Sequence, residues 1–265
     1  MPLTITQKNF GNLYVDFEYV VSNRDKLVEY VSQLLMGRSL HIKRIIQGLD
    51  PKYPKNTNKE NIQSIIDELS PDLNKKTLVY RVDGYLFQMI SWIALKIQHK
   101  DDSFYQFFPH MQPAMHGFDG IAVTLKPDKS IDKIIITEDK CTENQRKTVN
   151  EKVFPEFANY ENHKRDNGIK DHLTSLLNSV YNEEELLTID DNIYELSFRQ
   201  YRIGLTRGDN QVKEKDRLSC FEGYDTSVNG GIDRRQASTI LLSDLRNWMN
   251  QFRLDVISFL QSQIN

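Results

Sequence analysis

The chain has 265 residues, which suits one large domain, and its content of 39% hydrophobic and 27% charged residues is ordinary for a globular protein. The formal net charge is −3, whereas proteins that hold nucleic acid unaided are usually basic, so tight nucleic-acid binding by the chain alone is not expected. Two cysteines exclude a disulfide framework, and neither a secretory signal nor a membrane-spanning stretch is evident, so we expect a cytoplasmic protein with no membrane partner.

The N-terminal part of the chain is predicted to add a strand and helices to a later core. Residues 13–21 alternate in polarity as a strand does. Residues 25–36 and 62–69 carry apolar side chains at helical spacing. Residues 50–61 contain two prolines and several asparagines and lysines, and they read as a loop.

The middle of the chain, residues 77–206, is predicted to hold the core of the fold. Residues 85–98 are apolar nearly all round and indicate a buried helix, too short for the ~20 residues that span a bilayer. Residues 118–125 and 131–137 are apolar and β-branched, and a polar turn near Asp128 separates them. This pattern predicts an antiparallel hairpin.

Charged side chains gather at the open end of that hairpin. Pairing around the turn brings Asp119 opposite Glu138, and alternation along the strand puts Glu138 and Lys140 on one side with Asp139 on the other. One or two carboxylates with waters are typical ligands of Mg²⁺, and a lysine beside the metal can orient the reacting water. We therefore expect a Mg²⁺ or Mn²⁺ site formed by Asp119, Glu138 and the Asp139 main-chain carbonyl, with Lys140 as the catalytic ammonium.

A helix is expected directly after this strand. Residues 142–145 read Thr-Glu-Asn-Gln, a capping-box pattern, and the positive start of such a helix can hold a phosphate. Asn144, Arg146 and Lys147 on its first turns are candidate nucleic-acid contacts, while a solvated helix face explains them equally well. Pro155 is expected to break or kink the helix.

The C-terminal third is predicted to hold a strand, a loop and a helix. Residues 193–206 alternate in polarity over most of their length, which favours a long strand or two. Residues 207–235 are rich in glycine and charge and read as a long functional or partner-ordered loop. An apolar stripe over 238–263 predicts a final helix.

The motif formed by these residues resembles that of the PD-(D/E)XK restriction-endonuclease-like superfamily. Gly117-Phe118-Asp119 matches its first half, with Phe118 in place of a proline that supplies no ligand, and Glu138-Asp139-Lys140 matches its second half. The wider order, a Gly-led apolar helix, then His-Gly-Phe-Asp and then Glu-x-Lys, resembles the nuclease subunit of Hachiman-type antiphage defence systems.

The resemblance implies an α/β fold: a mixed central sheet flanked by helices, with a restriction-endonuclease-like core and helical additions at both ends of a single nuclease-like domain, residues 1–265. It implies a Mg²⁺- or Mn²⁺-dependent endonuclease that hydrolyses DNA, acting as an antiviral effector beside a helicase or other ATPase. In that fold the helix before the Asp strand often carries a further acidic or amide group near the metal. Asp83 and Gln88 are the nearest candidates for it, and His116 is a candidate DNA contact.

Other functions remain compatible with the same residues. A stand-alone type II restriction endonuclease would read a short sequence as a homodimer, and a scaffold subunit would keep the fold without turnover. A surface hairpin with scattered charges would also contain Asp, Glu and Lys at such spacing. The chain lacks P-loop, GxGxxG and GxSxG motifs, so any unwinding must come from another polypeptide.

Overall fold

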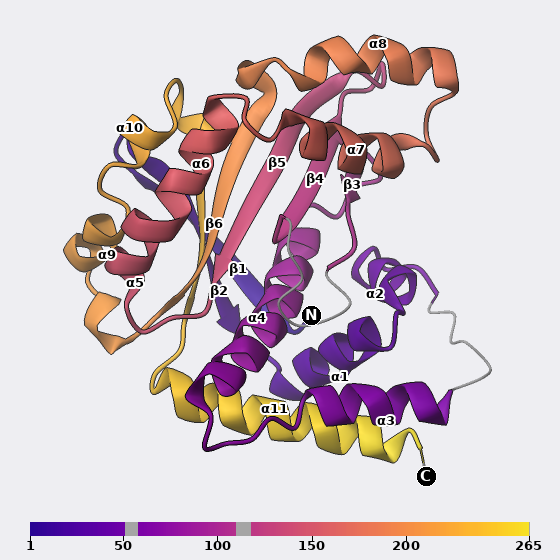
Figure 1. Ribbon diagram of the computed structural model, residues 1–265, viewed down its shortest axis with the longest axis vertical. Helices are drawn as coiled ribbons and strands as arrows, with labels where there is room; N and C mark the ends of the chain where they lie inside the picture. The colour runs from indigo at the N-terminus through magenta and orange to yellow at the C-terminus, as the bar shows by residue number, and fades with distance from the viewer. Residues whose placement is uncertain (51–57, 110–117, 265) are drawn as a thin grey trace.

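The computed structural model describes residues 1–50, 58–109 and 118–264, and a seven-stranded mixed sheet runs through its centre (Figure 1). The strands are β1 (Leu3–Phe10), β2 (Tyr14–Val21), β3 (Phe104–Gln106), β4 (Gly120–Leu125), β5 (Ile131–Lys140), β6 (Arg199–Arg207) and β7 (Arg235–Leu241). They lie in the order β1-β2-β7-β6-β5-β4-β3, with β2, β7, β6 and β5 parallel and antiparallel strands at both edges. The predicted α/β class with a mixed sheet flanked by helices is confirmed.

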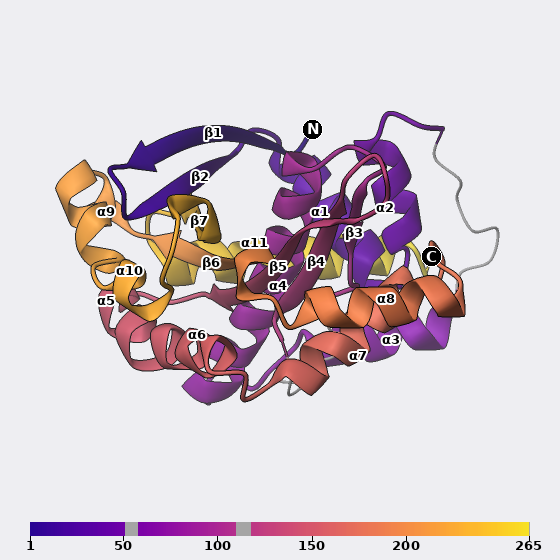
Figure 2. The same cartoon turned by 90° about the horizontal axis from the view of Figure 1, so that it is seen from above.

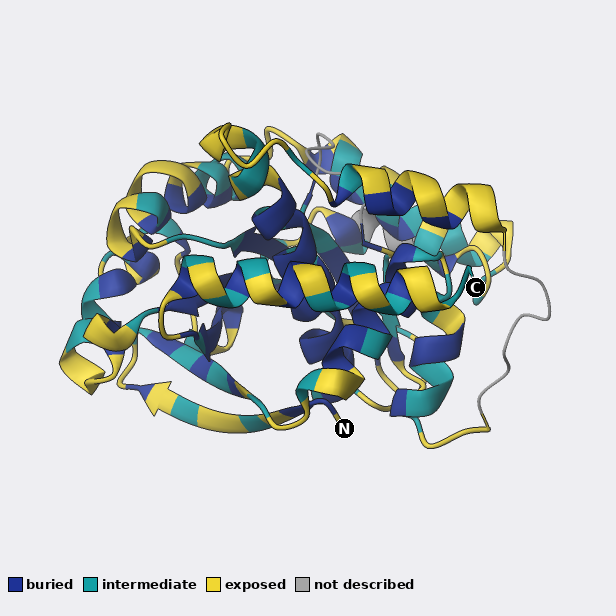
Figure 3. Cartoon of the chain, turned by 90° about the horizontal axis from the view of Figure 1, so that it is seen from below, coloured by how far each residue is buried: buried dark blue, intermediate teal, exposed yellow. Residues whose placement is uncertain are grey.

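Helices cover both faces of the sheet (Figure 2). One face packs against α1 (Arg24–Leu35), α2 (Ser39–Ile46), α3 (Lys59–Glu68), α4 (Lys76–Gln98) and α11 (Leu245–Ser262). The other packs against α5 (Gln145–Thr148), α6 (Phe154–Glu161), α7 (Asp166–Leu177), α8 (Glu183–Ile193), α9 (Glu214–Cys220) and α10 (Tyr224–Ser227). Along α11, buried and exposed positions alternate at helical spacing, as Figure 3 shows. None of the helices in the described ranges is both long and apolar enough to cross a membrane.

The β4–β5 hairpin forms as the sequence predicts. The Asp128 side chain accepts a hydrogen bond from Ser130 N (2.9 Å), and Lys129 adopts a positive φ of 67°, which together turn the chain sharply. Gly120 pairs with Thr137, so the residue before Gly120 lies opposite Glu138. The apolar side chains of both strands fill the core on the two faces of the sheet. The pairing of the two strands therefore brings Asp119 and Glu138 together at the open end of the hairpin.

The predicted C-terminal organisation is wrong in part. Residues 235–241 form β7, a strand in the middle of the sheet, and the final helix begins only at Leu245. The apolar residues around position 241 fit both a strand and a helical stripe, and pairing with β2 and β6 selects the strand. The expected loop over 207–235 contains α9, α10 and two short 3₁₀ turns. The strand expected from residue 193 begins at Arg199, because α8 extends to Ile193.

Two further predictions need correction. The N-terminal region contains two strands, since β1 pairs with β2 along its whole length. The loop expected over 50–61 ends early, because the Asn58 side chain accepts from Asn61 N (2.9 Å) and caps α3; residues 51–57 lie outside the described part. Pro155 does not break its helix: a π-helical turn, Val149–Val153, widens the chain just before it, and α6 continues.

Candidate active site

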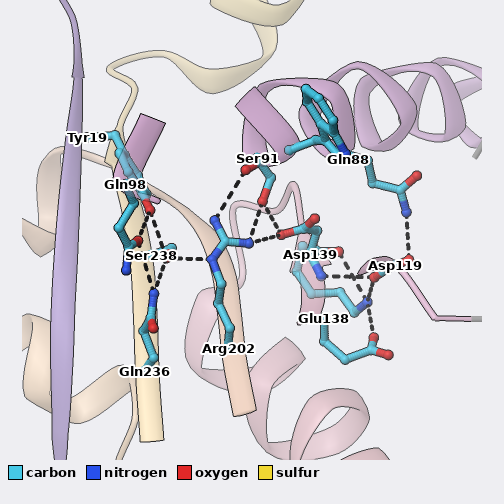
Figure 4. A network of polar contacts seen from close by, with 12 residues as sticks. Tyr19, Gln88, Ser91, Gln98, Asp119, Glu138, Asp139, Arg202, Gln236 and Ser238 are labelled. Atoms are coloured by element: carbon cyan, nitrogen blue, oxygen red, sulfur yellow. Dashed lines mark hydrogen bonds and ion pairs between the residues drawn. The ribbon is translucent and has the colours of Figure 1, made fainter. Parts of the chain in front are cut away.

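Three oxygen atoms converge on the Lys140 ammonium at the open end of the hairpin. Lys140 Nζ lies 2.9 Å from Asp119 Oδ2, 2.8 Å from Glu138 Oε2 and 3.1 Å from the Asp139 carbonyl oxygen. These are the three atoms that the sequence singles out as metal ligands. Glu138 contacts Lys140 on one side of β5. The Asp139 side chain points to the other side, toward Ser91 (Figure 4).

Asp119 is held from two directions. Its Oδ2 also accepts a hydrogen bond from Asp139 N (2.9 Å), so the carboxylate extends the hydrogen-bond ladder by one step just before β4 begins. Its Oδ1 accepts from Gln88 Nε2 of α4 at 2.6 Å. Of the two candidates on the preceding helix, the structure thus brings Gln88 to the site. Asp83 forms its ion pair with Arg246 of α11 at 2.5 Å instead.

Behind the site, a buried polar network fixes the end of β5 (Figure 4). Ser91 Oγ of α4 donates to Asp139 Oδ1 (2.6 Å), and Arg202 Nη1 of β6 lies 3.6 Å from the same oxygen. Arg202 also donates to Ser91 Oγ and, through Nε, to Ser238 Oγ of β7, both at 2.8 Å. The Arg202 side chain is 1% exposed. Because four elements meet here, the main chain between Glu138 and Lys140 is tied to the core.

A glycine makes room for this network. Gly204 pairs with Asp139 across the β5–β6 ladder. A Cβ atom built on Gly204 would lie 1.8 Å from Asp139 Oδ1 and 3.1 Å from Ser91 Oγ. Real atoms do not approach to 1.8 Å, so a methyl group at this position would displace the Asp139 carboxylate from its present place.

Burial dominates the electrostatics of the site. It raises the pKa of Glu138 to about 8, with Lys140 lowering it and Asp119 raising it further. Burial alone would lower the pKa of Lys140, but Glu138 and Asp119 outweigh it and hold the pKa above its usual value. Burial also raises the pKa of Asp139 to about 6, against the pull of Arg202. Three carboxylates, of which Glu138 and Asp139 are buried, face the two cations Lys140 and Arg202, and this excess of negative groups favours an added cation.

A cleft of about 590 Å³ opens beside Lys140, between the start of α4, the end of β5, the helix that follows and α11. Asn144 and Lys147, two of the candidate nucleic-acid contacts, are among the residues that line it. Arg146 forms an ion pair with Glu222 of 2.7 Å instead. The helix begins at Gln145 with Asn144 as its N-cap residue, and the expected cap Thr142 accepts from Asn144 N (3.0 Å). His116 lies outside the described residues.

The donor set fits a hard divalent cation. Among the described residues, no three His, Cys, Asp or Glu side chains are grouped to ligate a metal ion. Two carboxylates and a main-chain carbonyl remain, and Mg²⁺ commonly binds one or two carboxylates with water completing its shell. The three oxygens already surround a single positive charge, the Lys140 ammonium. A cation bound there would replace that ammonium.

Sequence reasoning did not identify Ser91, Arg202, Gly204 or Ser238. One signal was present: Arg202 lies between Tyr201 and Ile203 in the interior of a core strand, and an arginine there needs a buried acceptor. Its acceptors lie in α4, β5 and β7, whose proximity depends on the strand order. Comparisons of the chain with protein-family models, with curated proteins and with solved structures found no match.

Proposed function

We propose that the protein is a metal-dependent nuclease of the PD-(D/E)XK type that hydrolyses phosphodiester bonds of DNA. The observation that carries the proposal is the convergence of Asp119 Oδ2, Glu138 Oε2 and the Asp139 carbonyl on one point, which the Lys140 ammonium occupies. A helix-borne amide, Gln88, contacts the first of these carboxylates, as the resemblance leads one to expect.

Each residue of the cluster has a distinct task in this proposal. Asp119, Glu138 and the Asp139 carbonyl would hold the cation, which supplies polarisation of the phosphate and a bound water of lowered pKa. Gln88 donates to Asp119 Oδ1 and so fixes the orientation of that carboxylate. Lys140, released from the two carboxylates, is placed to donate a hydrogen bond to the attacking water or to a phosphate oxygen. Lys147 and Lys152 line the cleft and offer charge to neighbouring phosphates.

The proposal includes a helicase or other ATPase partner in a prokaryotic defence complex. The net charge of −3 and the absence of nucleotide-binding motifs support a division of labour in which the partner supplies DNA affinity and translocation. This part rests on the resemblance and on composition, and it is separable from the chemistry of the site.

The test is cleavage of single- and double-stranded DNA by the full chain in Mg²⁺ or Mn²⁺, with EDTA as the blank. We expect cleavage that needs the metal and is lost in Lys140→Met, which keeps the apolar stem and removes the ammonium. Lys133→Met is the matched control, since Lys133 lies on the same strand but pairs with Asp233 (2.5 Å) far from the cluster. If Lys140→Met cleaves as well as the wild type, the chemistry lies elsewhere; no cleavage by any form favours the scaffold.

A further inference from the structure

A second cavity, of about 390 Å³, lies between α2, α4, β3 and the end of α7. These elements lie near one another in Figures 1 and 2. The cavity is lined by two lysines, Lys43 and Lys96, and by the aromatic residues Trp92, Tyr105 and Phe108 among others. Its volume falls within the range of about 300–1,000 Å³ typical of small-molecule sites. The proposed nuclease chemistry does not use it.

The ammonium groups of the two lysines have few polar contacts within the described part of the chain. Lys96 is 2% exposed, and in the described part of the chain its Nζ makes one long hydrogen bond, to the Phe104 carbonyl at 3.4 Å. Burial lowers the pKa of Lys96 to about 8, and the nearby Lys43 charge acts in the same direction, while Asp101 and Asp102 oppose it. Neither lysine forms an ion pair with a described residue. An ammonium has three donors, so a bound anion would satisfy what the protein leaves open.

Aromatic and apolar surface stands beside this charge. Lys43 Nζ lies 5.9 Å from the Tyr105 ring centroid. Trp92 is fixed by its hydrogen bond to the Phe107 carbonyl (2.9 Å), whereas Phe108 is 52% exposed. Nucleobases stack on exposed aromatic side chains whatever their sequence, because every base has a flat π-face. Hydroxyl groups of Ser39, Ser175 and Ser179 add polar contacts to the wall.

We propose that this cavity binds a nucleotide, with its phosphate at Lys43 and Lys96 and its base against the aromatic wall. A purely apolar ligand would leave two ammonium groups uncompensated, and a simple anion would leave the aromatic surface uncovered. A nucleoside monophosphate meets both requirements with one molecule.

The cavity adjoins the candidate active site along α4. Trp92 follows Gln88 by four residues, which is one helical turn or about 6 Å along the axis, and Gln88 contacts Asp119. Phe107, next to Phe108, donates its main-chain N–H to the Ile121 carbonyl, two residues from Asp119. The nucleotide can therefore come from two sources with the same chemistry: a free mononucleotide, or the end of a strand that runs toward the cluster.

Isothermal titration of the full chain in EDTA tests the proposal without cleavage. The probes are adenosine 5′-monophosphate, adenosine and inorganic phosphate. We expect the monophosphate to bind at least tenfold more tightly than either fragment. Lys96→Met and Lys43→Met should each weaken its binding about tenfold or more, and Lys133→Met should leave it unchanged. No binding at millimolar concentration, or equal affinity in both cavity variants and the wild type, overturns the proposal.

A competition arm separates the two sources. The competitor is a short DNA strand that carries a 5′-phosphate. If it displaces the bound monophosphate at a tenfold lower concentration than free monophosphate requires, the cavity binds the end of a strand. If the strand displaces the bound monophosphate no better than free monophosphate does, the cavity binds a free nucleotide. Because EDTA removes metal, the outcome is independent of whether the chain cleaves DNA. Melting temperatures of both cavity variants confirm folding. Lys43 is partly exposed and Lys96 forms no ion pair with a described residue, so removal of either charge should leave the fold intact.

Discussion

Replacing Gly204 by alanine is the sharpest test of how the buried network holds the candidate site. The added Cβ would lie 1.8 Å from Asp139 Oδ1, and ordinary contact begins at 3.4 Å, so the carboxylate must move by about 1.6 Å (3.4 − 1.8). Such a shift breaks the 2.6 Å hydrogen bond from Ser91 and strains the contact with Arg202.

The cost can be bounded from these contacts. Overpacking a core by one methyl costs about 1–3 kcal/mol, and loss of a hydrogen bond to a charged group costs about 1.5–3 kcal/mol. Gly204→Ala should therefore lower the free energy of unfolding by about 2.5–6 kcal/mol. Gly84→Ala is the matched control. Gly84 lies within α4, and an added Cβ would have no neighbour within 4 Å. The free energy of unfolding of this variant should therefore rise by about 0.5–1 kcal/mol.

Urea denaturation of both variants gives these values directly. The double variant Gly204→Ala, Asp139→Ala removes the clashing carboxylate, so its two changes should be strongly non-additive, with the second partly relieving the first. Gly204→Ala as stable as the wild type, or additive changes in the double variant, would refute the reasoning. If Gly204→Ala loses cleavage at a temperature where it is folded, the buried network also determines the geometry of the candidate active site.

Three further predictions follow from the charges. Lys140→Met should bind Mn²⁺ more tightly than the wild type, because the ammonium occupies the point where the oxygens converge, yet it should fail to cleave DNA. Excess metal should partly restore cleavage by Glu138→Gln, because mass action offsets a lost ligand. The pKa of the buried Asp16 is raised from 3.8 to about 6, chiefly by burial, so the native state binds its proton more tightly than the unfolded state does. The free energy of unfolding of the wild type, relative to that of Asp16→Asn, should therefore fall by up to about 3 kcal/mol as the pH rises from 3.8 through 6. Urea titrations of both proteins at pH 3.5 and 7.5 measure this difference, and the same difference at both pH values would contradict the prediction. DNA binding by the isolated chain should be weak, with a shallow slope of log K against log salt, since each phosphate contact contributes about −0.9; a steep slope would remove the reason for a partner.

The local part of the site was predictable from the sequence. Alternation in the two strands and the turn around Asp128 predict the β4–β5 hairpin. A bulge between Thr124 and Leu125 shifts the register by one residue, and the resulting pairing brings Asp119 opposite Glu138 with Lys140 on the same side. These positions lie close along the chain, so they follow from a two-residue period.

The non-local part was not predictable. Arg202 reaches Asp139 only because β6 pairs with β5, and Ser238 reaches Arg202 only because residues 235–241 are a strand between β2 and β6. That segment carries apolar residues whose spacing fits a helix as well as a strand, and only the partners on either side decide between them. The choice between Asp83 and Gln88 likewise needed the angle at which α4 crosses the sheet.

Anomalous diffraction from crystals grown with Mn²⁺ near pH 8 is the most direct test of the central claim. The account predicts one metal peak bound by the Asp119 and Glu138 carboxylates and the Asp139 carbonyl, with Lys140 Nζ displaced from its present contacts of 2.8–3.1 Å with these atoms. Crystals saturated with Mn²⁺ that show no peak between Asp119 and Glu138, and keep the ammonium in place, would contradict it.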